Sequence, residues 1–192
     1  MKIAHWKPIQ IEDLPPLPVF ALALAYAALA LPAWHTLPTS RSVALASAAL
    51  AGMLIVLSVI DLKTFRLPDI LTLPLTLTGI ALAGSLGWDS FEWRIASAAL
   101  GFGSAYLVAY LYEAVRGRSG LGMGDAKLFA ASGAWVGGEG LITVLLYACV
   151  TALLAILTAR ARNTSVTKST AIPFGPFLAA GTWLVWLYGP LA

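Results

Sequence analysis

Two aspartates adjoin long uncharged runs of this sequence, where a carboxylate is costly and needs a reason. Asp61 directly follows the 18-residue run Val43–Ile60 with no polar spacer, and Asp125 stands just ahead of a shorter run. Two carboxylates brought together at the edge of a low-dielectric region cannot easily both ionise, so the pair is expected to share a proton. Such a pair is suited to aspartic proteolysis. The ionised partner takes a proton from water while the protonated partner polarises the scissile carbonyl.

Two other functions are compatible with the same carboxylates. A transporter or channel subunit could use Asp61 and Asp125 as a proton relay. No inverted repeat is evident, however, and both acids lie near one face rather than near the midplane. An assembly factor that has kept the fold but lost activity is disfavoured because both aspartates are present.

The glycines beside Asp125 point the same way. Gly120, Gly122 and Gly124 alternate in Gly120–Lys127 and leave a backbone without side-chain bulk. An extended substrate strand could approach closely there. The alternatives are a flexible loop and glycines that pack against neighbouring helices.

The composition indicates that the solvent around most of the chain is lipid. Of its 192 residues, 59% are hydrophobic and 11% charged, against roughly 45–50% and 25% in ordinary globular domains. This excludes a cytosolic enzyme, a secreted disulfide scaffold and a nucleic-acid-binding domain, despite a net charge of +3. Cys149 is the sole cysteine, and His5 and His35 have no partner at ligand spacing, so we expect no metal and no cofactor.

Seven uncharged runs predict the helices that must position the aspartates. A helix needs about 20 residues to cross the hydrocarbon, with some latitude. The run Leu128–Gly138 is the exception, because 11 residues reach only about 16 Å. To cross the membrane, its helix must also include Gly124–Lys127 and Glu139. Otherwise the segment is re-entrant and leaves the membrane on the side where it entered. The runs are Leu14–Ser40, Ser42–Ile60, Ile70–Trp88, Ile95–Tyr112, Leu128–Gly138, Gly140–Ala159 and Ser169–Ala192.

The distribution of Lys and Arg favours seven crossings. With a cytoplasmic N-terminus, 10 of these 12 residues lie inside and only Arg41 and Arg94 outside. A re-entrant Leu128–Gly138 would change the split to 7 and 5, against the positive-inside rule. We therefore predict an all-α polytopic membrane protein with seven transmembrane helices, N-terminus in and C-terminus out, forming one domain over 1–192. Both aspartates then lie at cytoplasmic helix ends. Glu12 and Asp13 precede the first run, where a signal peptide would carry basic residues, so we expect no cleavage.

Several further residues have two interpretations. Asp69, after Pro68, is placed to cap a helix that starts at Ile70, or to meet a basic substrate segment. Lys127 could tune the pKa of Asp125 or contact lipid headgroups. Tryptophans near run ends are expected to be interfacial anchors: Trp34, Trp88, Trp93 and Trp135. Two prolines are expected in the first turn of the last helix, as a helix start or as a backbone edge that aligns substrate: Pro173 and Pro176.

Three motifs in this order resemble those of the type IV prepilin peptidases, over the chain from about residue 43 onward. The first runs from Asp61 to Asp69 (Asp-Leu-Lys-Thr-Phe-Arg-Leu-Pro-Asp), followed by Leu-Pro-Leu at 73–75. The second is Gly122-Met-Gly-Asp125-Ala-Lys127-Leu, which looks like the family's Gly-x-Gly-Asp signature. The third, Pro173-Phe-Gly-Pro-Phe-Leu-Ala179, resembles the segment that opens the family's last helix.

The resemblance implies an aspartic endopeptidase of the bacterial inner membrane. Such enzymes remove the basic leader from prepilins and type II secretion pseudopilins, cutting on the cytoplasmic side after a glycine. By motif match, Asp61 and Asp125 are the catalytic aspartates. The residues expected to contact substrate are Gly122, Gly124, Lys127, Asp69, Pro173 and Gly175.

The chain departs from the full-length family pattern in one respect. Members that also methylate the new N-terminus usually carry a cytoplasmic insert with paired Cys-x-x-Cys motifs, whereas this sequence has one cysteine. It resembles a short form, for which we expect no methyltransferase activity. A more general intramembrane protease with the Gly-x-Gly-Asp signature stays a rival, and the sequence does not name the substrate or the oligomeric state.

Overall fold

The structure, a computed structural model, describes residues 19–30, 41–85, 88–117, 120–161 and 172–191. Within these ranges every regular element is a helix, which confirms the all-α prediction. The helices are α1 (Val19–Ala30), α2 (Arg41–Thr64), α3 (Asp69–Gly84), α4 (Trp88–Arg116), α5 (Met123–Val136), α6 (Gly138–Ala161) and α7 (Gly175–Tyr188).

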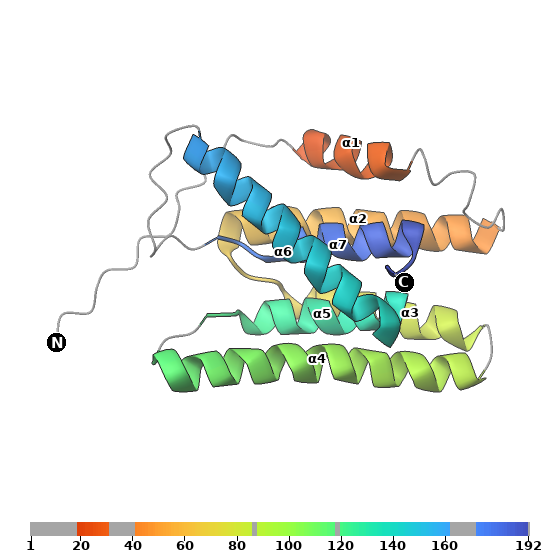
Figure 1. The fold of residues 1–192 in the computed structure, drawn as a ribbon. Helices are drawn as coiled ribbons and strands as arrows, with labels where there is room; N and C mark the ends of the chain where they lie inside the picture. Colours follow the sequence, from red (N-terminus) through yellow and green to blue (C-terminus); the bar gives the residue numbers. More distant parts are fainter. Residues whose placement is uncertain (1–18, 31–40, 86–87, 118–119, 162–171, 192) are drawn as a thin grey trace.

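Successive helices run in opposite directions, apart from the oblique course of α6 across the bundle (Figure 1). The end of α2 and the starts of α3, α5 and α7 therefore lie on one side of the bundle, which we call the aspartate end. The start of α4, the end of α5 and the start of α6 lie on the other side, which we call the opposite end. The three motifs, separated by up to about 110 residues in sequence, thus meet at the aspartate end.

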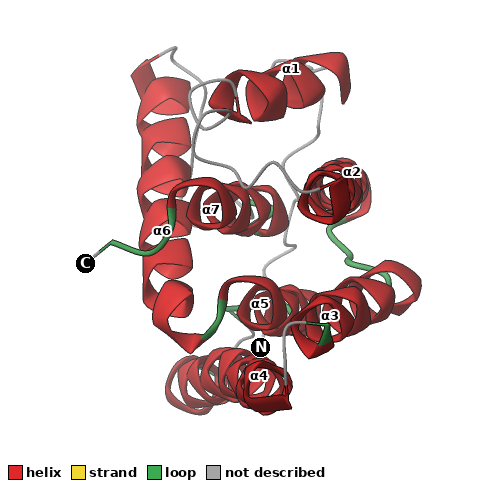
Figure 2. Ribbon diagram, turned by 90° about the vertical axis from the view of Figure 1, so that its right-hand side faces the viewer, coloured by secondary structure: helices red, strands yellow, loops and turns green. Residues whose placement is uncertain are grey.

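Helix α5 lies in the middle of the bundle, between α3, α4, α6 and α7 (Figure 2). Small residues allow this close packing, as in other membrane helix pairs. A Cβ on Gly101 of α4 would lie 2.6 Å from the carbonyl oxygen of Phe129, and one on Gly133 of α5 would collide with the carbonyl of Ser97. The helix that carries Asp125 is consequently held on several sides.

One face of α2 forms the core and ends on Asp61. Its buried residues recur at helical spacing: Ser47, Leu50, Leu54, Leu57, Ser58 and Asp61. Leu50, Leu54 and Leu57 are completely buried. Asp61 continues this stripe and is only 5% exposed, so the side chain points into the bundle.

Three of the described helices are long and apolar enough to cross a bilayer: α2, α4 (over Ser90–Arg116) and α6. Together with the composition, they make this a membrane protein. Helix α5 begins at Met123 and so includes Gly124–Lys127, as a crossing helix would require, whereas Glu139 belongs to α6. Its 14 residues span about 21 Å. Seven crossings and the orientation of the termini therefore stay predictions, and Lys2, Lys7, Arg118, Arg162 and Lys168 lie outside the described residues.

The prediction for Trp135 is wrong. This residue is 3% exposed, its indole N–H donates to the carbonyl of Leu75 at 2.7 Å, and its ring packs edge-on against Trp186. A tryptophan near the end of a short apolar run can anchor at an interface or pack in the core. Here the neighbouring α3 covers it and offers a hydrogen-bond acceptor. Trp34 and the side chain of Trp88 are outside the described part of the chain.

Candidate active site

The end of α2 fixes the position of Asp61. Phe65 adopts a left-handed backbone conformation (φ 52°), and its N–H donates to the carbonyl of Asp61 at 2.8 Å. This is a common way to end a helix, although for a residue other than glycine it costs about 1–2 kcal/mol. Pro68 follows and turns the chain into α3. Asp61 thus occupies the last turn of a rigid helix rather than a loop.

The carboxylate of Asp61 meets the start of α7. The backbone N–H of Gly175 donates to Asp61 Oδ2 at 3.0 Å, and this bond is buried. A Cβ on Gly175 would lie 2.6 Å from the same oxygen, so only glycine permits this approach. The first N–H groups of a helix have no partner within it and lie at the positive end of the helix dipole. The third motif therefore supplies a donor to the first.

Asp125 lies in the first turn of α5, where it is the third helical residue after the N-cap Gly122. Its Oδ2 accepts the Gly122 N–H at 3.3 Å. Asp125 is outside the three helices long enough to cross a bilayer. Burial raises the pKa of Asp125 to about 7, and the nearby charge of Asp61 adds to the rise, while the Gly122 N–H opposes it. The fold thus places Asp125 near Asp61: Phe174, which lines the same cavity as Asp125, directly precedes Gly175, the donor to Asp61.

Two of the three glycines beside Asp125 are needed by the protein's own packing. A Cβ on Gly124 would lie 2.9 Å from Cβ of Leu67, and one on Gly120 would collide with the ring of Tyr112. The packing alternative therefore applies at these two positions, and contact of Gly124 with substrate stays a prediction. Gly122 differs, because a Cβ there would meet only Asp125, at 3.2 Å from Oδ2, and the backbone around it.

Asp69 and Lys127 contact each other. Lys127 Nζ lies 2.6 Å from Asp69 Oδ1, an ion pair that joins the start of α3 to the start of α5. The predicted capping role of Asp69 is wrong: Pro68 is the N-cap and Asp69 the first helical residue, without a side-chain cap bond. A carboxylate in a first helical turn is still favoured by the helix dipole. Here the carboxylate of Asp69 pairs with the ammonium group of Lys127 rather than with a backbone N–H of its own helix.

The two prolines of the third motif occupy different positions. Pro176 lies in the first turn of α7, as predicted, but Pro173 precedes the N-cap Phe174 and is outside the helix. Pro173 is buried, with Gly175 two residues further on. Its fixed φ favours one path of the chain into the contact between Gly175 and Asp61.

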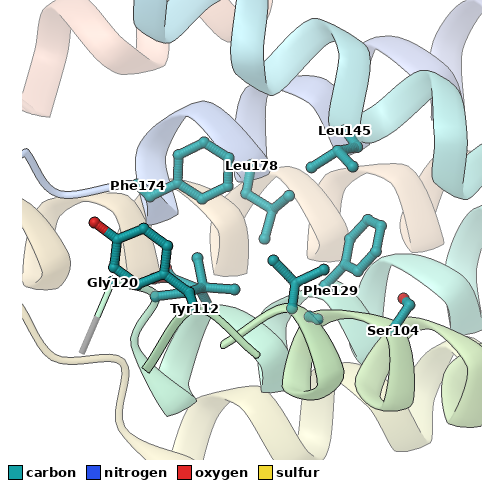
Figure 3. Close-up of a pocket in the computed structure, with 11 residues that line it drawn as sticks. Ser104, Tyr112, Gly120, Phe129, Leu145, Phe174 and Leu178 are labelled. Carbon is teal, nitrogen blue, oxygen red and sulfur yellow. The ribbon is translucent and has the colours of Figure 1, made fainter. Parts of the chain in front are cut away.

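An apolar cavity of about 380 Å³ adjoins Asp125 (Figure 3). Tyr112, Phe129, Phe174 and Leu178 surround it in the close-up, with Leu145 of α6 beyond them. None of these side chains is among the residues predicted to contact substrate. The signals were present: Phe129 lies one helical turn after Asp125, Phe174 belongs to the third motif, and the α4 members recur at helical spacing. The lining is Ser104, Ala105, Val108, Tyr112, Gly120, Leu121, Asp125, Phe129, Leu145, Phe174 and Leu178.

The described residues contain no group of three or more His, Cys, Asp or Glu side chains that could hold a metal ion. Cys149 is exposed on α6, away from the aspartates in sequence and on a helix that contributes only Leu145 to the cavity. The expected absence of a metal or cofactor stays a prediction.

The fold and site define a helical membrane protein with two coupled aspartates at one end of its bundle. A family model described as the type IV leader peptidase family matches residues 48–157. The chain belongs to this family.

Curated relatives carry the same name, prepilin leader peptidase/N-methyltransferase. The protein of Pseudomonas aeruginosa is 39% identical over 138 residues, which cover 71% of this chain and 47% of that protein. The one of Xanthomonas campestris pv. campestris is 38% identical over 143 residues (73% and 48%), and the one of Aeromonas hydrophila 36% over 169 residues (88% and 55%). The chain spans about half the length of the curated relatives it matches. No solved structure matches it significantly.

Proposed function

We propose that this protein is a membrane-embedded aspartic endopeptidase that removes the basic leader from type IV prepilins or type II secretion pseudopilins. One observation carries the proposal: the fold brings Asp61 and Asp125, from motifs 64 residues apart, together at one end of the bundle. There Gly175 donates to Asp61, and the preceding Phe174 lines a cavity with Asp125. Family membership and the names of the relatives support the substrate class.

Different surroundings suggest different roles for the two aspartates. Asp125, whose pKa is raised to about 7, is suited to stay protonated and to donate a hydrogen bond to the scissile carbonyl. Asp61, which accepts the Gly175 N–H, is suited to act as the carboxylate that takes a proton from the attacking water. The proton that Asp61 gains from water passes to the leaving nitrogen as the C–N bond breaks, and Asp125 keeps its proton for the next cycle. Because water is the nucleophile, no covalent intermediate is formed.

The neighbouring residues are proposed to act at the same site. Gly122 leaves the backbone beside Asp125 unhindered toward substrate, while Gly175 orients Asp61 and Pro173 fixes the path of the chain to it. Gly124 allows α5 to approach Leu67. Asp69 and Lys127 are both partly exposed, so their ion pair can meet the charged part of a substrate as well as join α3 to α5.

We propose the seven-span topology with a cytoplasmic aspartate end, in an inner membrane and as one domain over 1–192. Five basic residues of the described part belong to this end and two to the opposite end, Arg41 and Arg94. Excess Lys and Arg on one side is typical of the cytoplasmic face. The five are Lys63, Arg66, Arg116, Lys127 and Arg160. Reporter fusions after Ser85 should read external and fusions after Thr64 internal. The reverse result would overturn the orientation.

Leader cleavage without N-methylation is the proposed activity. The 192 residues contain one cysteine and hence no Cys-x-x-Cys pair. The test uses purified protein in proteoliposomes, a prepilin-type substrate with a basic leader, and mass spectrometry of the product with and without S-adenosylmethionine. We expect cleavage after the glycine and no gain of one methyl group. A proton-relay transporter would instead give no cleavage but a proton flux that depends on both aspartates.

A further inference from the structure

We propose that the cavity beside Asp125 binds the large apolar side chain that follows the scissile bond, and that Val108 and Leu145 limit its size. This inference rests on the proposed endopeptidase function and adds a specificity site to it. The cavity lies between the C-terminal half of α4, the segment 120–121, α5, α6 and the start of α7.

The direction of the cavity matches the path of a membrane-anchored substrate. Asp125 is at its mouth on the aspartate end, and Phe129 lies one helical turn further into the bundle. On α4 the lining runs from Tyr112 back to Ser104, a distance of about 12 Å along the helix axis. A chain whose scissile bond reaches Asp125 therefore has an apolar space on the side that leads into the membrane.

The volume of the cavity suits a large side chain. A cavity of about 150 Å³ lined by apolar residues can hold benzene, and this one measures about 380 Å³. Aromatic rings provide much of its wall, with those of Tyr112 and Phe174 at one side of the space and that of Phe129 at the other in Figure 3. One aromatic or branched aliphatic side chain fits, with room for part of the next residue.

The polar groups of the lining favour a peptide over a lipid chain. Ser104 Oγ already donates to the carbonyl of Gly101 at 3.1 Å. The lining also contains the carboxyl of Asp125 and the hydroxyl of Tyr112, and in the wall of an acyl-chain site these polar groups would lose hydration without gaining a partner. A peptide bond beside the seated side chain gives that carboxyl a partner.

The cavity opens on the outer surface of the bundle. Two of its lining residues, Val108 of α4 and Leu145 of α6, are 60% and 44% exposed, so this side of the cavity also reaches the surface of the bundle. A substrate helix that arrives through the lipid can thus insert its side chain laterally. Larger residues at these two positions would narrow the space without touching either aspartate.

The experiment pairs enzyme variants with substrate variants. Val108→Phe and Leu145→Phe fill the cavity from two helices. Val115→Phe on α4 and Leu153→Phe on α6 are the matched controls, because both positions are exposed and neither lines the cavity. Each enzyme is tested in proteoliposomes on two substrates that differ only in the residue after the cut, a phenylalanine or an alanine, and the melting temperature of each variant is measured.

We expect Val108→Phe and Leu145→Phe to lower kcat/KM at least tenfold for the phenylalanine substrate and less than threefold for the alanine substrate. The controls should change neither value by more than twofold. Equal losses on both substrates, with an unchanged melting temperature, would overturn the proposal and favour a lipid-binding or purely structural cavity, as would no loss on either substrate. If the unmodified protein cuts neither substrate, the proposed endopeptidase function fails instead, so the two failures are distinguishable.

Discussion

The two ends of the bundle treat their charged groups differently. At the opposite end, Arg94 donates to the carbonyl of Trp135 at 2.5 Å, and Glu139 accepts the indole N–H of Trp93 at 3.1 Å. The carbonyl of Trp135 is in the last turn of α5, where a cation is favoured by the helix dipole. Gly137 links α5 directly to α6 with a φ of +82°, which requires glycine. Here the polar groups fasten helix ends together.

At the aspartate end, neither Asp61 nor Asp125 forms an ion pair with any residue that the structure describes. Each accepts one backbone N–H and they repel each other. The cation nearest in sequence to Asp125, Lys127, is paired with Asp69. Placing two coupled carboxylates together without a counter-charge destabilises the fold locally. From the contrast with the opposite end we infer that this arrangement serves the proposed chemistry rather than stability.

Removing either carboxylate at the aspartate end should have the largest effect on activity. Asp61→Asn and Asp125→Asn should each lower kcat about 10³–10⁴-fold, because one half of the acid–base pair is lost. The double variant should be little worse, as expected for groups that act as a unit. The measurement is single-turnover cleavage by purified enzyme. Turnover within tenfold of the unmodified protein by either single variant would refute the dyad.

Gly175→Ala should have the next largest effect. The new Cβ would lie 2.6 Å from Asp61 Oδ2 and displace that carboxylate. A misplacement of about 1 Å can cost about 100-fold in rate, so we expect kcat to fall 10- to 100-fold with KM almost unchanged. Gly52→Ala on α2 is the control, since a Cβ there would have no atom within 4 Å beyond its own stretch of helix. Equal kcat values for the two variants would contradict the orienting role of Gly175.

The pH profile should report the state of Asp125. Its pKa of about 7 means that the protonated form is present below that pH and is lost above it. If protonated Asp125 is the acid, kcat/KM should fall as pH rises through about 7, approaching tenfold per pH unit. The measurement is kcat/KM between pH 5.5 and 9 at constant ionic strength. A profile that stays flat to pH 9 would show that Asp125 is not needed in its protonated form.

The ion pair between α3 and α5 should have a smaller effect. A partly exposed pair contributes about 0.2–1 kcal/mol, so Asp69→Lys or Lys127→Asp alone should reduce kcat about two- to tenfold through the position of α5. The reversed pair, with both changes together, should recover most of this loss. Failure of the reversed pair to recover, combined with a KM that rises for basic leaders, would instead favour direct contact with substrate.

Substitutions at the opposite end should leave the cleavage activity almost unchanged. Glu139→Gln keeps an acceptor for the Trp93 indole and should leave kcat/KM within about twofold, with a decrease in melting temperature of a few degrees at most. Circular dichroism melting in detergent and the same cleavage assay check this. A loss of activity comparable with that of Asp125→Asn would remove the distinction between the two ends.

Much of the architecture was accessible from the sequence because lipid imposes simple rules. Uncharged runs must be helices, since backbone groups in hydrocarbon need internal partners. Each of the seven runs contains more than half of one helix of the described chain. The boundaries of α5 were harder: its run of 11 uncharged residues omitted Met123–Lys127, because charged residues in a first turn interrupt the run without interrupting the helix.

The sequence by itself determined the helices, their alternating direction and the motifs that single out Asp61 and Asp125, because apolar runs and short loops allow few arrangements. The tertiary structure decided which groups meet. That Gly175 reaches Asp61, that Lys127 pairs with Asp69 and that Gly124 packs on Leu67 depend on how α3, α5 and α7 approach α2. The cavity beside Asp125 was likewise decided by the tertiary structure. Its walls come from four helices and two connecting segments, and no local pattern specifies the space that remains once they pack.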